Sequence, residues 1–78
     1  MKQINEQLTA EQVYEMFKSE AEYAQVGEFG FDRRKCVAIH GYDDKVLAVI
    51  FPQFPETWEK HFNAVLALNK KNAVVIQL

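Results

Sequence analysis

The sequence has little of several residue types, and each shortage excludes a class of protein. Its 78 residues include one cysteine, two prolines and three glycines. A single cysteine excludes a disulfide framework and a four-thiolate zinc site, and so little proline and glycine excludes a collagen-like or flexible chain. Nine basic against eleven acidic residues leave a net charge of −2, which excludes attachment to nucleic acid or anionic lipid by bulk charge alone.

Long apolar runs are also missing. The N-terminal segment lacks the apolar stretch of a signal peptide, and the longest apolar run, residues 46–51, is far shorter than the ~20 residues that span a membrane. We therefore expect no membrane contact. A lone cysteine suits a reducing compartment, so we expect a cytoplasmic location.

Aromatic side chains, in contrast, are abundant. Six phenylalanines, three tyrosines and one tryptophan make up 13% of the chain. A chain of this length has a small interior. The aromatic residues therefore indicate either one aromatic-rich core or a surface that binds a partner or a second copy, and a homodimer is the expected assembly.

The first part of the chain predicts an arm followed by a helix. Residues 1–8 carry no regular pattern, and Thr9 can cap a helix over residues 9–25. Gln12 lies three residues after Thr9, which completes a capping box, and apolar residues then recur at spacings of three and four. Gly27 supplies a stop beyond the C-terminal end.

The second part predicts a hairpin, a helix and a last strand. Residues 36–51 contain two runs rich in β-branched and aromatic residues around a Gly-Tyr-Asp-Asp turn, which predicts a β-hairpin with His40 opposite Lys45. An amphipathic helix with proline in its first turn is predicted for residues 55–71. The uncharged residues 73–78 predict a strand.

Together these elements predict a compact single α+β domain over residues 1–78, in the order α-β-β-α-β. A return through a helix makes the last strand parallel to the second strand of the hairpin. The expected fold is therefore a three-stranded mixed sheet packed with two helices. The last strand can join the sheet beside either strand of the hairpin, and the sequence leaves both positions open.

No group of residues predicts catalysis. Cys36 and His40 would lie about 13 Å apart on one strand at ~3.3 Å per residue, too far to share a metal ion. Cys36 has no base beside it in the sequence, and we expect an inert buried thiol there. The expectation is a protein that is not an enzyme and that uses no metal and no cofactor.

Two surfaces are candidates for binding a partner. One is the loop over residues 26–35, because loops with exposed aromatic and guanidinium groups often hold binding hot spots. Its candidate residues are Phe29, Phe31, Arg33 and Arg34. The other is the acidic face of the first helix, which either complements a basic partner or is simply solvated. Its candidate residues are Glu11, Glu15 and Glu22.

These features favour a small non-enzymatic module that docks on a larger protein and modulates it. Small acidic, aromatic-rich domains of this kind include bacterial and phage-encoded inhibitors and adaptors, an analogy of class that identifies no target.

Two other functions stay open. The run Gly27-Glu28-Phe29-Gly30-Phe31 partly matches the strand with which RNA-recognition domains stack on bases, so a single-stranded nucleic-acid binder is the second hypothesis. The acidic Glu28 and Asp32 depart from that pattern. A regulatory domain with a small-molecule pocket lined by Trp58, Tyr42 and His61 is the third.

Overall fold

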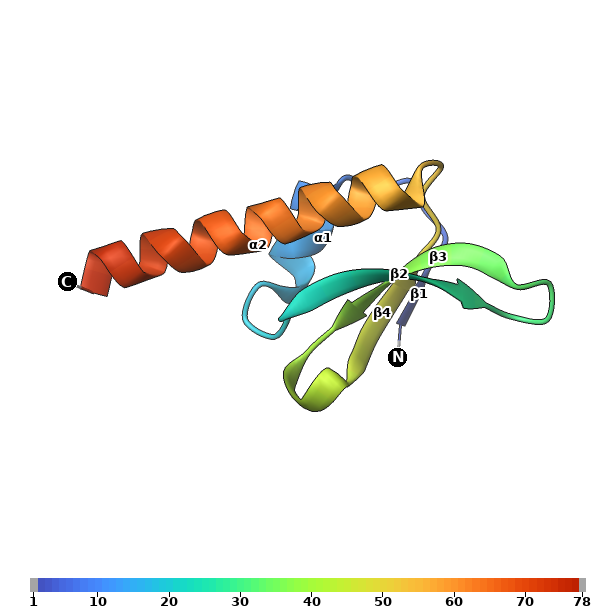
Figure 1. Ribbon diagram of the computed structural model, residues 1–78, viewed down its shortest axis with the longest axis horizontal. Coiled ribbons are helices and arrows are strands. Elements are labelled where there is room, and N and C mark those ends of the chain that lie inside the picture. Colours follow the sequence, from blue (N-terminus) through green and yellow to red (C-terminus); the bar gives the residue numbers. More distant parts are fainter. Residues whose placement is uncertain (1, 78) are drawn as a thin grey trace.

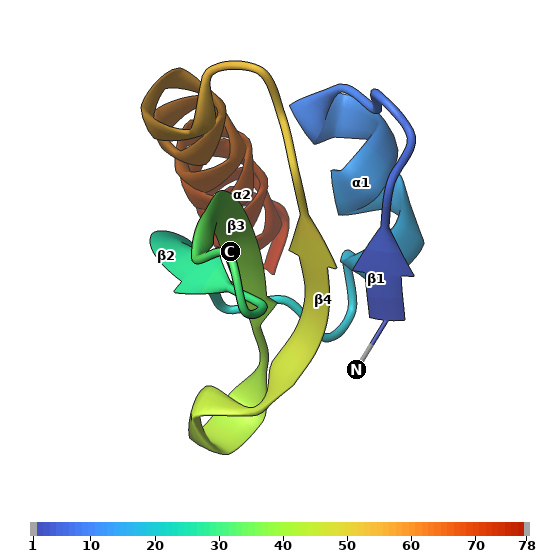
Figure 2. The ribbon, with the colours of Figure 1, turned by 90° about the vertical axis from the view of Figure 1, so that its right-hand side faces the viewer.

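A four-stranded mixed sheet carries two α-helices on one of its faces (Figures 1 and 2). This computed structural model describes the backbone of residues 2–77 and the side chains of residues 2–70. The elements are β1 (Lys2–Ile4), α1 (Ala10–Phe17), β2 (Tyr23–Phe29), β3 (Arg34–His40), the 3-10 turn η1 (Tyr42–Asp44), β4 (Val46–Ile50) and α2 (Pro55–Gln77). The strand order is β1-β4-β3-β2, with β1 parallel to β4 and the other neighbours antiparallel.

The main core lies between the sheet and the helices. Side chains alternate between the two faces of the sheet along β3 and along β4 from Ala48, so that every second one there points toward α1 and α2. The largest fully buried side chains are Val13, Val37, Ile39, Ile50 and Phe62. They join both helices to the central strands, and the α+β class expected from the sequence is confirmed.

No helix in the described part of the chain lies on the opposite face of the sheet (Figure 2). Side chains of the sheet itself pack together on that face. Cys36, Val49 and Phe51 form a second, smaller cluster on that face, and Phe29 and Val46 pack against it. Phe51 is only 6% exposed. This face is therefore not an open apolar patch.

The predicted element order and strand count are wrong in two places. Part of the expected N-terminal arm is strand β1, which pairs in parallel with β4 and so takes a position expected for the C-terminal strand. The last residues of the expected first helix belong instead to β2, which pairs with β3. The sheet therefore has four strands, and the chain ends in a helix.

Helix α1 begins as expected and ends early. The Thr9 hydroxyl accepts from the Gln12 N–H at 3.2 Å, and the Gln12 side chain accepts from the Thr9 N–H at 2.8 Å, which confirms the capping box. The helix stops at Phe17, whose carbonyl accepts hydrogen bonds from Glu20 and Ala21 in a tight turn. Ala21 and Ala24 are still buried, but they reach the core from the turn and from β2 rather than from a helix.

The strand predicted over residues 73–78 is also wrong. Residues up to Gln77 continue helix α2, and Leu78 lies outside the described residues. No glycine or proline separates this segment from the helix, and each further residue of a growing helix adds one backbone hydrogen bond. Local strand preference was therefore overridden.

The predicted β3–β4 hairpin is present with a different register. His40 lies opposite Val46, not Lys45, and the pairing is irregular between Ile39 and His40. An irregularity of one residue exchanges the faces of the neighbouring side chains. As a result Val46 packs with the cluster that contains Cys36, and Leu47 packs with the helix-side core.

Candidate functional site

The turn between β2 and β3 holds the most exposed aromatic side chain among the described residues. We call residues 30–33 the hairpin tip. Gly30 and Arg33 have positive φ values of 90° and 52°, and the Arg33 N–H donates to the Gly30 carbonyl at 3.2 Å. Phe31 is fully exposed, with a relative exposure of 111%. The tip therefore presents an uncovered aromatic ring from a hydrogen-bonded turn.

The tip stands on a packed aromatic base. The Phe29 ring meets the Phe51 ring edge to face, with centroids 6.0 Å apart and planes at 62°. The Arg34 guanidinium lies 4.3 Å from the centroid of Phe51. Cation–π and aromatic contacts of this kind hold side chains in defined orientations. Phe29 and Arg34 are thus positioned before any partner arrives.

An ion pair ties the hairpin to the start of α2. Lys35 Nζ donates to the Glu56 carboxylate. This hydrogen bond raises the pKa of Lys35 and lowers the pKa of Glu56. Both side chains are exposed, so the pair contributes little to stability. It neutralises Lys35, and Arg33 makes no ion pair among the side chains that the structure describes.

The structure brings the four predicted loop residues to one end of the sheet. Phe29 ends β2, Phe31 and Arg33 lie in the tip, and Arg34 begins β3. Phe51, which supports them, was missed because the sequence does not reveal which strand lies beside which. The only available signal was its position just before Pro52, at the end of a strand.

The acidic surface predicted on the first helix is not a single surface. Glu22 lies outside α1, in the segment before β2. Each predicted carboxylate also pairs with a nearby cation or imidazole. The pairs are Glu11–His61 at 2.6 Å, Glu15–Lys18 at 3.2 Å and Glu22–Lys70 at 3.1 Å. Lysine ammonium groups neutralise Glu15 and Glu22, which then attract a basic partner less strongly, so this candidate surface is weakened.

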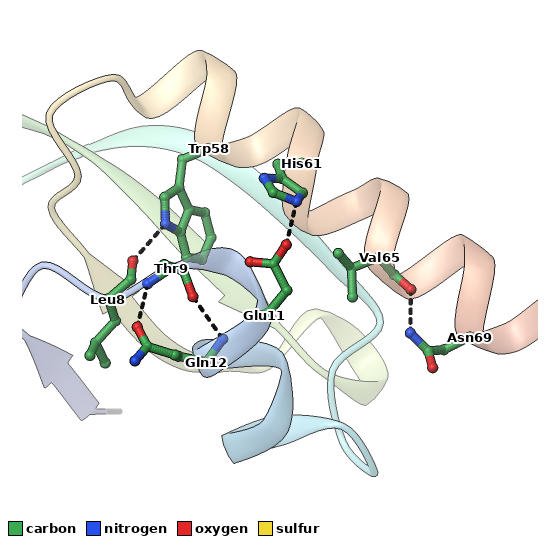
Figure 3. A network of polar contacts seen from close by, with 8 residues as sticks. All are labelled: Leu8, Thr9, Glu11, Gln12, Trp58, His61, Val65 and Asn69. Carbon is green, nitrogen blue, oxygen red and sulfur yellow. Dashed lines mark hydrogen bonds and ion pairs between the residues drawn. The ribbon is translucent and has the colours of Figure 1, made fainter.

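A groove lies where the N-terminal ends of α1 and α2 approach each other. It has a volume of about 360 Å³, and its lining includes Leu8, Phe54, Trp58, Glu11 and His61. The Trp58 Nε1–H donates to the Leu8 carbonyl at 3.0 Å, and the indole stacks on Phe62 with centroids 5.3 Å apart. Figure 3 shows Trp58 and the Glu11–His61 pair spanning the two helices.

The pocket predicted from Trp58, Tyr42 and His61 is therefore only partly assembled. Trp58 and His61 line this groove, whereas Tyr42 lines a different hollow together with Lys45 and Leu47. The hydrogen bond of its own backbone N–H lowers the pKa of Glu11, and the adjacent His61 ring acts in the same direction. The groove is thus lined in part by a carboxylate, that of Glu11.

Cys36 is buried, as expected, and burial raises the pKa of its thiol. Among the described residues no three histidine, cysteine or carboxylate side chains gather in a way that could hold a metal ion. No helix within the described part of the chain has the length and apolar character needed to cross a membrane.

Comparisons of the chain with protein-family models, curated proteins and solved structures found no match.

Proposed function

We propose that this chain is a small non-enzymatic binding module that docks its hairpin tip on a larger protein and modulates that protein. The observation that carries the proposal is the fully exposed Phe31 ring on a structured turn. Burying a phenylalanine side chain in a partner contributes about 1.5–3 kcal/mol. Because the turn is already ordered, less of that gain is lost in fixing the contact.

The chemistry around Phe31 describes the surface it fits. Arg33 lies in the tip and Arg34 follows it, and both are exposed. Aromatic and arginine side chains are enriched in binding hot spots. The complementary surface is an apolar pocket with carboxylates at its rim, because opposite charge speeds encounter and fixes orientation.

Binding of single-stranded nucleic acid is the competing function, and the packing of the aromatic base argues against it. Bases stack on aromatic faces that are open to solvent. Phe29, one of the two rings of the motif, already packs edge to face against Phe51, which leaves Phe31 as the one ring of that motif open to a base. Asp32 in the tip and Glu28 before it also carry negative charge, which would repel phosphates.

The lone cysteine is buried, which suits a reducing compartment. We therefore retain the cytoplasm as the proposed location of the protein.

Affinity capture tests the proposed function. The full chain is immobilised, a cell lysate is passed over it, and the proteins retained are compared with those retained by Phe31→Ser and by Tyr42→Ser. Tyr42 is a matched control, since it is 79% exposed in the other turn. We expect Phe31→Ser to lose a stoichiometric protein that both the wild type and Tyr42→Ser retain.

Two results would contradict the proposal. Equal recovery of that protein by all three chains would show that the tip is not the contact. Recovery abolished by nuclease, with affinity falling steeply as salt rises, would show that phosphates are bound instead.

A further inference from the structure

The groove between α1 and α2 matches the hairpin tip in chemistry. The groove is lined by the aromatic side chains of Phe54 and Trp58, by other apolar residues and by polar residues that include Glu11. The tip offers an exposed phenyl ring, Phe31, and an arginine, Arg33, two residues further on. An aromatic ring beside a cation is the complement of an aromatic groove beside a carboxylate.

The charges of the two surfaces oppose each other. Glu11 and His61 are the ionisable side chains that line the groove, and Glu11 is the carboxylate among them. Lys35 near the tip is held by Glu56. Arg33 is exposed and makes no ion pair among the described side chains, which leaves its charge available to Glu11 of another molecule.

Both surfaces lie at the same end of the molecule. Phe51 supports the hairpin through Arg34, and the next residue, Pro52, already lines the groove. The Lys35–Glu56 pair joins the hairpin to the first turn of α2. The tip itself projects beyond the N-terminal end of α2 and away from the body of the molecule (Figure 1), where it can meet a second copy.

We propose that two copies of this chain form a reciprocal dimer, in which the hairpin tip of each copy occupies the groove between α1 and α2 of the other. Phe31 enters the groove beside Phe54 and Trp58, and Arg33 pairs with Glu11. Two donors and two acceptors related by a two-fold axis close the assembly at two chains. The inference rests on the proposed function, because it uses the tip as a protein-binding element, and it names a second copy as one partner.

The test is the oligomeric state of the full chain, measured by sedimentation velocity and light scattering over a concentration series. We expect the average mass to rise toward that of a dimer and no further. Phe31→Ser and Arg33→Glu should each weaken association at least about tenfold, whereas Tyr42→Ser should leave it unchanged. Trp58, the single tryptophan of the chain, lines the groove. In the wild type its fluorescence should shift over the same range of concentrations in which the average mass rises.

A charge exchange makes the test specific. Arg33→Glu and Glu11→Arg each place like charges opposite one another at both sites of their homodimers. In a mixed dimer of the two variants, one site keeps the original pair and the other holds the reversed pair. We therefore expect each variant alone to be weakened and an equimolar mixture to recover association. Circular dichroism and thermal unfolding of each variant verify that it is folded.

Four results would overturn the dimer. They are a wild type that stays monomeric at every concentration, oligomers that grow beyond two chains, association that ignores Phe31, and a mixture that recovers nothing. If the chain is monomeric and still captures a larger protein through Phe31, the dimer is wrong and the proposed function stands. If the reciprocal dimer forms and the capture experiment returns nothing that depends on Phe31, the dimer stands and the proposed function fails.

Discussion

At the scale of single residues, Cys36 shows how packing determines reactivity. The residue is 3% exposed and lies with Val49 and Phe51 on the sheet face without helices, and burial raises the pKa of its thiol. The thiolate is the nucleophilic form of cysteine. A buried thiol with a raised pKa is therefore poorly accessible to reagents and is less often in the thiolate form, although Arg34 lies close by in the sequence.

We predict that Cys36 reacts slowly with thiol reagents in the native chain. Alkylation at neutral pH should be at least about a hundredfold slower than in urea-unfolded chain, because reaction must wait for local opening of the sheet. The time course of mass increase measures this directly. Equal rates of alkylation in folded and unfolded protein would show that Val49 and Phe51 do not cover the thiol.

At the scale of elements, the free edge of β2 is covered by side chains of α2. The Asn63 amide accepts from the Ala24 N–H at 2.8 Å and donates to the Ala24 carbonyl at 3.0 Å. The Glu59 carboxylate accepts from the Val26 N–H at 2.7 Å. Uncovered edge strands pair with other chains. Asn63 and Glu59 thus satisfy edge groups that would otherwise bind a further strand.

Replacing Asn63 should expose this edge. We predict that Asn63→Ala lowers the free energy of unfolding by about 1–3 kcal/mol, since part-buried backbone groups lose their partners, and increases self-association at high concentration. Urea titration and light scattering measure the two effects. Asn69→Ala is the matched control. Within the part of the chain whose side chains are described, the Asn69 amide donates to the Val65 carbonyl of its own helix, and exposed changes of that kind cost within about 0.5 kcal/mol. An unchanged Asn63→Ala chain would refute the covering role.

The same contacts explain which elements could be predicted from the sequence. Helix starts with local chemistry, such as the Thr9 capping box, and the hairpin of β3 and β4 were predictable. Residues 23–25 were assigned to a helix because Ala21 and Ala24 fit its spacing equally well. Their strand conformation depends on pairing with β3 and on Asn63, which lies 39 positions after Ala24. Such distant contacts leave no trace in a local pattern.

At the scale of the whole molecule, the exposed apolar side chains lie at turns, in one loop and on helices rather than on the sheet. Among the described residues the large ones are Met16, Phe31, Tyr42, Phe54 and Leu68. Of the residues predicted to bind a partner, Phe31 belongs to this exposed set. The sequence did not predict that Phe54 and Trp58 would line a groove at the same end of the molecule, because that proximity exists only once the β4–α2 connection is folded.

Charge pairing across the whole surface determines how stability depends on pH. Glu11 and Glu56 both have folded-state pKa values below the ordinary value of 4.5: Glu11 chiefly through its own backbone N–H and then His61, and Glu56 chiefly through Lys35. A carboxylate with a lowered pKa stabilises the fold at pH values above its unfolded pKa. That stability is lost as pH falls through the folded pKa, because the unfolded chain takes up protons first.

We therefore predict that the free energy of unfolding falls as pH is lowered below about 4.5. The slope should be shallower in Glu11→Gln and in Glu56→Gln than in the wild type, and shallower still in the double variant. Glu20→Gln is the control, since Glu20 is exposed and forms no ion pair among the described side chains. Urea titrations across the acid range measure the slope, and added salt should reduce the differences because exposed pairs are screened. If no glutamate variant changes the slope, the acid sensitivity arises from other groups. That result would also argue against the Glu11–His61 pair as a link between α1 and α2 and against the Lys35–Glu56 pair as a link between α2 and the hairpin.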